Sequence, residues 1–274
     1  MTVETLERHV GATDGRAALT DVLDLALAAL AEPVPGLTVA GRWRVAGARG
    51  GIEVRAALGD TRPVWVQRLT RLAAGPALLA VRLAVAVTGR RPYTTLFPEP
   101  AHPRILAVVR QGTAGPPTQA ERALFAVLVR GPRTGDVPAP DVRAVLPLLR
   151  CAVDAEGAWL HTVSDPADRE RLATSLTPVR DADPDDELLV LGSHHHSPAG
   201  DLQAGQAMQR VLLTARFLGL DAAVLADPSE LAGRRSADVP GAGPGLLPQI
   251  VLCVGRNRRE PGGGLMGCAG AVRR

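Results

Sequence analysis

Two apolar segments bounded by glycines constrain the fold of this chain more than any other feature of its sequence. They span residues 75–89 and 205–219, and the second lies 130 positions after the first (205 − 75 = 130). In the second segment strong helix formers dominate, apolar residues recur at helical spacing, and Gly219 stands where a helix commonly ends. Each segment predicts a helix that is apolar on more than one face, which is typical of a helix inside a core.

The elements around these two central helices recur in the same order. Each helix is followed by a predicted strand and by an apolar run ending in a basic residue, at 93–97 and 105–110 and again at 222–226 and 250–256. Each is preceded by an apolar helix and a strand containing tryptophan, at 19–31 and 43–45 and again at 141–155 and 159–163. Helices rich in Ala and Leu can resemble each other by composition alone, but four elements in one order favour duplication. We therefore predict two fused halves, residues 1–115 and 116–274.

The remaining elements are predicted from local signals. Glycines at 47, 50 and 51 predict a hairpin between 42–45 and 52–58, and a further strand is expected at 188–191. The first central helix is expected within 64–88, mainly at 72–88, with Pro76 near its start. Helices are also expected at 119–130, after an N-capping Asp141, and at 167–176, with linkers or loops at 112–118, 177–187 and 229–246.

Composition limits the classes of function. All 31 basic residues are arginine, which indicates a coding bias, and the net charge is only +3. Because the arginines are scattered and aromatic residues make up 3% of the chain, nucleic-acid binding is not expected. Pro76 and Arg82 interrupt the most apolar segment, so we expect a core helix and no membrane partner. The acidic N-terminus and three cysteines without Cys-x-x-Cys spacing favour a reduced, cytoplasmic protein.

Several segments together resemble a known family. They are residues 204–215, Gly219-Leu220, 248–252, 103–110, 121–124 and 155–158. This pattern is similar to the Acg-like branch of the nitroreductase superfamily, over roughly residues 19–255. The resemblance implies an α+β fold built around FMN. Ordinary members are homodimers with flavin at the interface, and Acg-like members resemble such a dimer fused into one chain, which agrees with the repeat.

The first flavin motif of that branch is eroded here. Where the branch carries A-P-S-x-H-N-x-Q-P-W, this chain has Val34, Gly36, Leu37 and Val39 in place of Ser, His, Asn and Gln. Each lost hydrogen bond is worth about 0.5–1.5 kcal/mol, so the loss amounts to several kcal/mol of cofactor affinity. The resulting apolar wall of Val34, Leu37 and Val39 is predicted to contact a small-molecule substrate instead.

The other implied flavin positions are mixed. In the phosphate motif R-R-T-x-R, Arg133 and Thr134 are retained, but Asp136 replaces the last arginine and would repel a phosphate. The resemblance further assigns cofactor contacts to a second set of residues, namely Arg42, Trp43, Leu225, Ala226, Arg258 and Arg259. For Arg133, Arg258 and Arg259 the alternative is solvated surface charge. The lid of the branch is reduced to 177–187.

Other candidate chemistry is sparse. In the run His194-His195-His196 only His194 and His196 could share a ligand on a strand, and no Cys or acidic pair completes a metal site. Three alternatives remain for this run, from the most to the least favoured: a solvated loop, a substrate contact by His194 and His196, and a metal site. His161 is expected in the core or at a sheet edge, and Cys253 in a buried strand. No catalytic residue is assigned.

Two classes of function remain. One is a degenerate nitroreductase-like protein with a small-molecule cleft, in which FMN is bound weakly or lost, acting as a binding protein, a partner subunit or a cofactor-free enzyme. The other is an FMN-dependent oxidoreductase that reduces a small electron-poor substrate with a nicotinamide donor, or dehydrogenates a small metabolite. Because a fused pair already completes its own core, we expect a monomer, or a dimer through a surface unlike that of the family.

Overall fold

A computed structural model describes residues 15–30, 43–48, 50–57, 63–131, 140–175, 186–227, 231, 239–242 and 245–256. The chain is an α+β protein, as predicted. Its described helices are α2 (Gly15–Ala28), α3 (Val64–Val87), α4 (Gln119–Arg130), α5 (Val142–Asp154), α6 (Pro166–Ser175) and α7 (Pro198–Phe217). The strands are β1 (Trp43–Ala48), β2 (Gly51–Ala56), β3 (Arg90–Leu96), β4 (Ile105–Ala114), β5 (Ala158–Thr162), β6 (Glu187–Ser193), β7 (Leu220–Ala226) and β8 (Leu247–Arg256).

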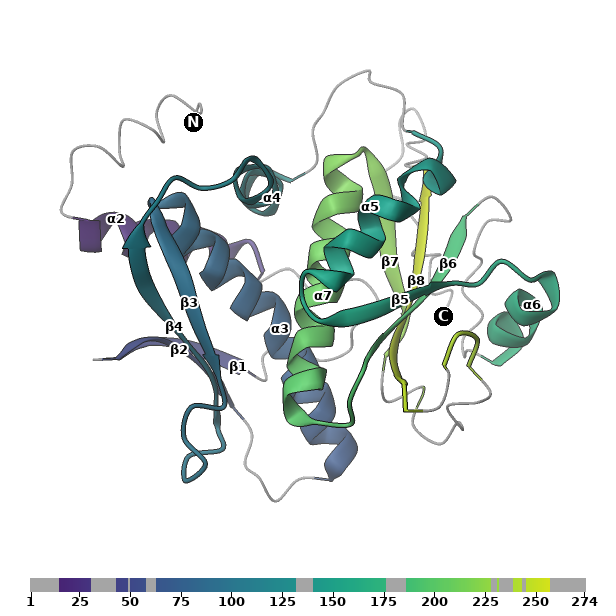
Figure 1. Ribbon diagram of the computed structural model, residues 1–274, viewed down its shortest axis with the longest axis horizontal. Helices are drawn as coiled ribbons and strands as arrows, with labels where there is room; N and C mark the ends of the chain where they lie inside the picture. The colour runs from purple at the N-terminus through teal and green to yellow at the C-terminus, as the bar shows by residue number, and fades with distance from the viewer. Residues whose placement is uncertain are drawn as a thin grey trace, which may run out of the picture.

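The eight strands form two four-stranded antiparallel sheets with matching topology. The first sheet has the order β1-β2-β4-β3 and the second the order β5-β6-β8-β7. In each sheet the central helix, α3 or α7, connects the second strand to the third. Figure 1 shows α3 and α7 lying between the two sheets, one sheet on each side. The repeated order of elements expected from the sequence is therefore present as a repeated arrangement in space.

The two central helices cross at their equivalent glycines. A Cβ atom added at Gly205 would overlap the carbonyl oxygen of Leu72 and lie 3.1 Å from the Cα of Gly75. A Cβ added at Gly75 would overlap the backbone of Gly205. Only glycine at both positions permits this approach, so the two central helices pack directly against each other.

Near the crossing, each central helix places a leucine in the core of the other half. Leu72 of α3 packs in the core cluster of the second sheet, with residues such as Leu189 and Ile250. Leu202 of α7 packs in the cluster of the first sheet, with residues such as Val54. Leu72 and Leu202 are 130 residues apart (202 − 72 = 130), the same separation as Gly75 and Gly205, and each packs in the core of the other sheet.

The position of Pro76 differs from the prediction. Helix α3 begins at Val64, so Pro76 lies in its interior and is buried, rather than near its start. A proline cannot donate the helical hydrogen bond to the carbonyl four residues earlier, which here belongs to Leu72. That carbonyl oxygen is the atom against which Gly205 packs. The proline is tolerated because the carbonyl it leaves without a helical partner faces the partner helix at the crossing.

Both central helices end as their glycines predict. Gly89 and Gly219 follow the two helices with φ of +79° and +78°, in the left-handed region that favours glycine. Among the described helices, α3 alone is long and apolar enough to cross a membrane by length and composition, and 83% of its most apolar window is buried within the protein. The expectation that the segment containing Arg82 forms a core helix is confirmed.

The tryptophans of the two halves occupy different faces of their sheets. Trp43 on β1 packs towards α3, against Leu69 and Ala73. Trp159 on β5 faces the opposite side of its sheet from α7, and its indole Nε1 donates to the carbonyl of Ser193 over 3.1 Å. Trp43 is the first residue of β1, whereas Trp159 is the second residue of β5. Because side chains alternate along a strand, this difference of one residue puts the two rings on opposite faces of their sheets. The tryptophan strands therefore correspond in order but not in side-chain direction.

Several local predictions are confirmed. The β1–β2 hairpin pairs antiparallel around Gly50 and Gly51. Asp141 caps α5 by accepting a hydrogen bond from the backbone of Arg143 over 3.1 Å. Cys253 is buried in β8. Two boundaries are corrected, because β4 extends to Ala114 into the expected linker, and β6 begins at Glu187, the last residue of the expected acidic loop.

Candidate functional site

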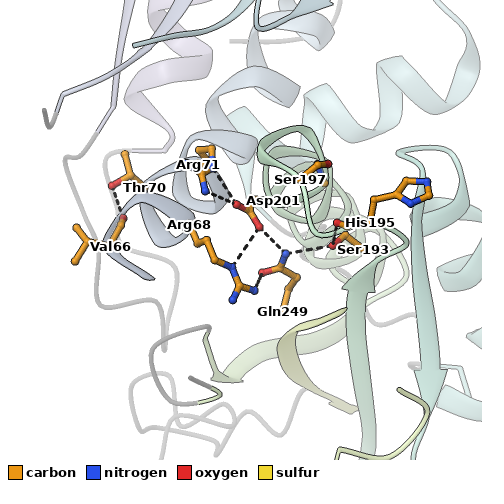
Figure 2. Close-up of polar contacts among 10 residues, drawn as sticks. Val66, Arg68, Thr70, Arg71, Ser193, His195, Ser197, Asp201 and Gln249 are labelled. Atoms are coloured by element: carbon orange, nitrogen blue, oxygen red, sulfur yellow. Dashed lines mark hydrogen bonds and ion pairs between the residues drawn. The ribbon is translucent and has the colours of Figure 1, made fainter. Parts of the chain in front are cut away.

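A buried polar cluster joins the two halves where the second turn of α3 meets the first turn of α7 (Figure 2). It consists of Arg68 and Arg71 from α3, Asp201 from α7, Ser193 from the end of β6 and Gln249 from β8; we call it the inter-half cluster. Asp201 is its centre, with a side chain 4% exposed. Polar residues from both halves thus converge on one carboxylate inside the protein.

The geometry satisfies Asp201 on both oxygens. Arg71 donates from Nε to Oδ2 over 2.9 Å, and its Nη2 lies 2.8 Å from the same oxygen. Gln249 donates from Nε2 to Oδ1 over 2.8 Å, and Arg68 Nε lies 3.5 Å from that oxygen. Gln249 in turn accepts from Arg68 Nη2 over 3.1 Å and donates to Ser193 over 3.3 Å. A buried charge is tolerated when it is paired and hydrogen-bonded in this way.

Local sequence explains why these groups lie here. Ser197 caps α7 by accepting from the backbone of Gly200, and Asp201 follows in the first turn, where a negative charge is stabilised by the helix dipole. Arg71 lies one turn before Gly75 on α3, as Asp201 lies one turn before Gly205 on α7. Because the helices cross at those glycines, equivalent positions carry opposite charges and meet.

The inter-half cluster carries more positive than negative charge. Two guanidinium groups, of Arg68 and Arg71, face the single carboxylate of Asp201. Arg71 makes a two-atom contact with Asp201, whereas Arg68 Nε is buried without a hydrogen-bond partner among the described residues. The Arg68 side chain is 24% exposed, so it connects the interior of the cluster to solvent. A small anion could satisfy this remaining positive charge.

A second buried carboxylate joins the halves at the other side of the crossing. Glu156, with a side chain 2% exposed, accepts from Arg82 of α3 over 2.5 Å and from Arg210 Nε of α7 over 2.7 Å. Arg82 also donates to Gln206 over 2.7 Å. All the polar atoms named here are engaged with one another, so this group acts as a structural link between α3, α7 and the end of α5.

A third carboxylate lies at the start of β6, away from the crossing. Glu187 accepts from Nε of the exposed Arg143 over 2.7 Å and lies 3.9 Å from Arg169. Its hydrogen bond and charge raise the pKa of the Arg143 guanidinium above its ordinary value. Arg169 also donates to the backbone carbonyl of Asp186 over 2.7 Å. These contacts tie α5 and α6 to the second sheet.

The predicted flavin residues that the structure describes do not gather at one place. Trp43 packs against the first sheet and α3. Leu225 and Ala226 are buried in a different cluster, on the face of the second sheet opposite α7. Val34, Leu37, Val39, Arg42, Arg133, Thr134, Arg258 and Arg259 lie outside the described residues. Among the described residues, Trp43 therefore does not lie with Leu225 and Ala226.

The histidine run lies next to the inter-half cluster. His194, His195 and His196 are all exposed, in the turn between β6 and α7, and the backbone carbonyl of His195 accepts from Ser193 over 3.1 Å. Within the described part of the chain, no group of three or more His, Cys, Asp or Glu residues could hold a metal ion. Figure 2 shows the His195 ring pointing away from Asp201 and Arg68, so the run approaches the cluster through its backbone.

Sequence reasoning did not identify the inter-half cluster. Arg68, Asp201 and Gln249 belong to no motif of short spacing. One usable signal was present, because Arg71 and Asp201 are opposite charges separated by the repeat distance of 130, within apolar helices. No protein-family model matches this chain, and comparison with curated proteins finds no match.

Proposed function

We propose that the protein is a degenerate nitroreductase-like pseudo-dimer, formed by two fused halves, that binds a small anionic molecule at the inter-half cluster and holds FMN weakly or not at all. The observation that carries this proposal is the matching strand order of the two sheets around helices that cross at Gly75 and Gly205. This arrangement is what the family resemblance implies for a fused pair.

Ligand chemistry is inferred from the charges. Arg68 is partly exposed, its Nε has no hydrogen-bond partner among the described residues, and the cluster holds two arginines against one aspartate. The N-terminal ends of α3 and α7 lie nearby and add partial positive charge. Phosphate or carboxylate groups match a guanidinium in charge and geometry. We further propose that the exposed His194 and His196 contact the ligand. We also propose that the protein is cytoplasmic.

The second candidate is an FMN-dependent oxidoreductase. The partial burial of Trp43 against α3 favours it, since the resemblance assigns this residue to the cofactor site. In that case the flavin would supply the redox chemistry, and the protein would bind and orient substrate. The position of Leu225 and Ala226 on the far face of the second sheet favours the degenerate protein instead.

The decisive experiment compares FMN, riboflavin and inorganic phosphate by isothermal titration calorimetry on the purified protein. We expect no visible flavin absorbance after purification, and FMN affinity in the micromolar range or weaker. Val34→Ser, Leu37→Asn and Val39→Gln together should tighten FMN binding by restoring hydrogen-bonding groups. Tight binding by the unmodified protein would establish the oxidoreductase instead.

A matched pair of variants tests the anion site. Arg68→Gln should weaken phosphate and FMN binding about tenfold or more, because a charge-assisted contact is lost. Arg150→Gln, an exposed arginine on α5, removes the same charge elsewhere and should leave binding unchanged. If Arg68→Gln binds phosphate as well as the unmodified protein, the inter-half cluster is not the site.

A further inference from the structure

One face of the first sheet carries a group of arginines that no part of the proposed function uses. The inner face, which includes Ile52, Val54 and Val109, packs against α3. Because side chains alternate along a strand, residues between these positions point to the outer face. The residues of interest there are Arg44 on β1, Glu53 and Arg55 on β2, Tyr93 on β3 and Arg110 on β4, with Arg91 beside them at the irregular start of β3; we call this the basic sheet face.

The basic sheet face is exposed and positively charged. All four of its arginines and Tyr93 are exposed, and the tyrosine ring is 64% exposed. Its one carboxylate, Glu53, accepts from Arg55 Nε over 2.5 Å, and Arg91 lies 3.7 Å from Glu121 of α4. Four arginines against Glu53 and Glu121 leave a surplus of +2 on this surface (4 − 2).

Strand register sets the spacing of the groups. Tyr93 on β3 lies directly opposite Arg110 on β4, and Arg44 lies opposite Arg55 on β1 and β2. Side chains directly opposite each other are about 5 Å apart at Cβ, and those two residues apart on one strand, as Arg91 and Tyr93 are, about 6.6 Å. The exposed ring of Tyr93 therefore lies on the same face of the sheet as Arg110, whose side chain extends towards the β1–β2 turn on the far side of β4.

Glycines keep Arg110 in place on this surface. A Cβ added at Gly51 would lie 3.1 Å from Arg110 Cγ, and one added at Gly50 would lie 3.7 Å from its Nη2. The arginine side chain therefore extends over the β1–β2 turn, where glycines leave room for it.

We propose that the basic sheet face binds single-stranded nucleic acid. A base would stack on Tyr93, and the adjacent phosphates would pair with Arg110 and Arg91, with Arg44 and Arg55 contacting the strand farther along. An acidic peptide would use the arginines but would gain little from an exposed aromatic ring on the same surface. The ring is the observation that favours nucleic acid over an acidic protein.

This inference departs from the expectation drawn from composition. The four arginines are scattered over residues 44–110 and do not form a basic run in the sequence. They meet only because β1, β2, β3 and β4 pair in one sheet with this register. The second sheet offers no equivalent surface, since β6 is buried along its whole length.

The test is fluorescence anisotropy with labelled 12-mers of thymidylate and uridylate and the full chain. We expect binding that weakens steeply with salt, since each phosphate neutralised contributes about −0.7 to the logarithmic slope. Arg55→Gln with Arg110→Gln should reduce affinity at least about tenfold at low salt and flatten the slope. Tyr93→Ala should reduce affinity about tenfold at unchanged charge, and Tyr93→Phe should preserve it.

Controls separate this surface from the inter-half cluster and from general charge effects. Arg150→Gln removes one exposed charge from α5 and should leave oligonucleotide binding unchanged, as should Arg68→Gln, which tests the proposed function separately. All variants are at solvent-exposed or partly exposed positions, and circular dichroism verifies their folding. Absence of oligonucleotide binding overturns the proposal. The proposal is also overturned if polyglutamate of matched charge displaces the oligonucleotide equally well and Tyr93→Ala leaves binding unchanged. That pair of results would indicate an acidic protein partner.

Discussion

The two sheets share one strand order but differ in how their faces are covered. In the second sheet β6 is buried at every position, because α7 and α5 cover one face and a cluster including Leu172 of α6 and Trp159 covers the other. In the first sheet β2 alternates, with Val54 buried against α3 and Arg55 exposed. The shared part of each half is therefore the sheet and its central helix, while the outer layer differs. The outer face of the first sheet is buried at Val108 but exposed at Arg44, Arg55, Tyr93 and Arg110, which leaves these side chains free to carry a binding surface.

Equivalence of the halves should be most evident at the helix crossing. Gly75→Leu and Gly205→Leu should each destabilise the protein by more than about 4 kcal/mol or prevent folding, because even a Cβ would overlap backbone of the opposite helix. Chemical denaturation followed by circular dichroism measures this effect. Gly219→Leu is the control, where the open surroundings limit the cost to the left-handed backbone, about 1–2 kcal/mol. If either crossing variant is as stable as the control, the two glycines do not meet as described.

The buried carboxylate Glu156 tests how firmly the halves are joined. Glu156→Gln should destabilise the protein by about 2–3 kcal/mol, below the usual cost of breaking a buried pair, since Arg82 and Arg210 are 26% and 15% exposed and partly hydrated. Denaturant titration at neutral pH provides the measurement. Glu99→Gln, at an exposed position, is the matched control and should have little effect. An unchanged midpoint for Glu156→Gln would show that solvent screens this group.

Adjacent substitutions on equivalent strands would test the difference in covering. On β6, Leu188→Ala and Leu189→Ala lie on opposite faces and should each cost about 2–4 kcal/mol, since both side chains are buried. On β2, Val54→Ala should cost about 2 kcal/mol and Arg55→Ala less than about 0.5 kcal/mol. Unfolding free energies of the four variants give the pattern. A cost at Arg55 similar to that at Leu188 would mean that the outer face of the first sheet is covered.

Sequence reasoning identified the elements that depend on local signals and on the repeat. Periodicity, glycine ends and the Asp141 cap located the central helices and most other elements, because these features act within one segment. It misplaced Pro76, since a proline inside a helix is tolerated only through the contact of Leu72 with Gly205, which joins distant segments. The faces of Trp43 and Trp159 could not be distinguished, because one residue of register reverses them.

The candidate sites depended even more on contacts between distant segments. Asp201, Gln249 and Arg68 come from three elements, and nothing local marks them as partners. The arginines of the basic sheet face are scattered in the sequence, because strand pairing rather than spacing brings them together. The flavin residues predicted by resemblance fall largely outside the described residues, and Leu225 lies in the core on the far face of its sheet.

The smallest expected effect concerns α4, the helix that follows the first sheet. Thr118 accepts a hydrogen bond from the backbone of Glu121, whose side chain accepts from the backbone of Thr118 over 2.6 Å in return. Thr118→Ala should cost about 1 kcal/mol, the usual worth of such a cap. Ala120→Gly is an exposed substitution two residues later, in the first turn of α4. It should cost a similar amount, about 1 kcal/mol, through helix propensity alone.

The parts of the protein in which Thr118→Ala accelerates hydrogen exchange show whether the two halves unfold together. Leu124 and Phe125 of α4 pack in one cluster with Leu79 of α3 and Leu213 of α7, so the helix contacts the central helices of both halves. If the two halves form one cooperative unit, Thr118→Ala lowers the global free energy of unfolding, and hydrogen exchange accelerates equally in β4 and β8. Faster exchange confined to α4 would instead mean that this helix frays on its own. Acceleration in β4 alone would mean that the halves unfold separately despite the crossing at Gly75 and Gly205.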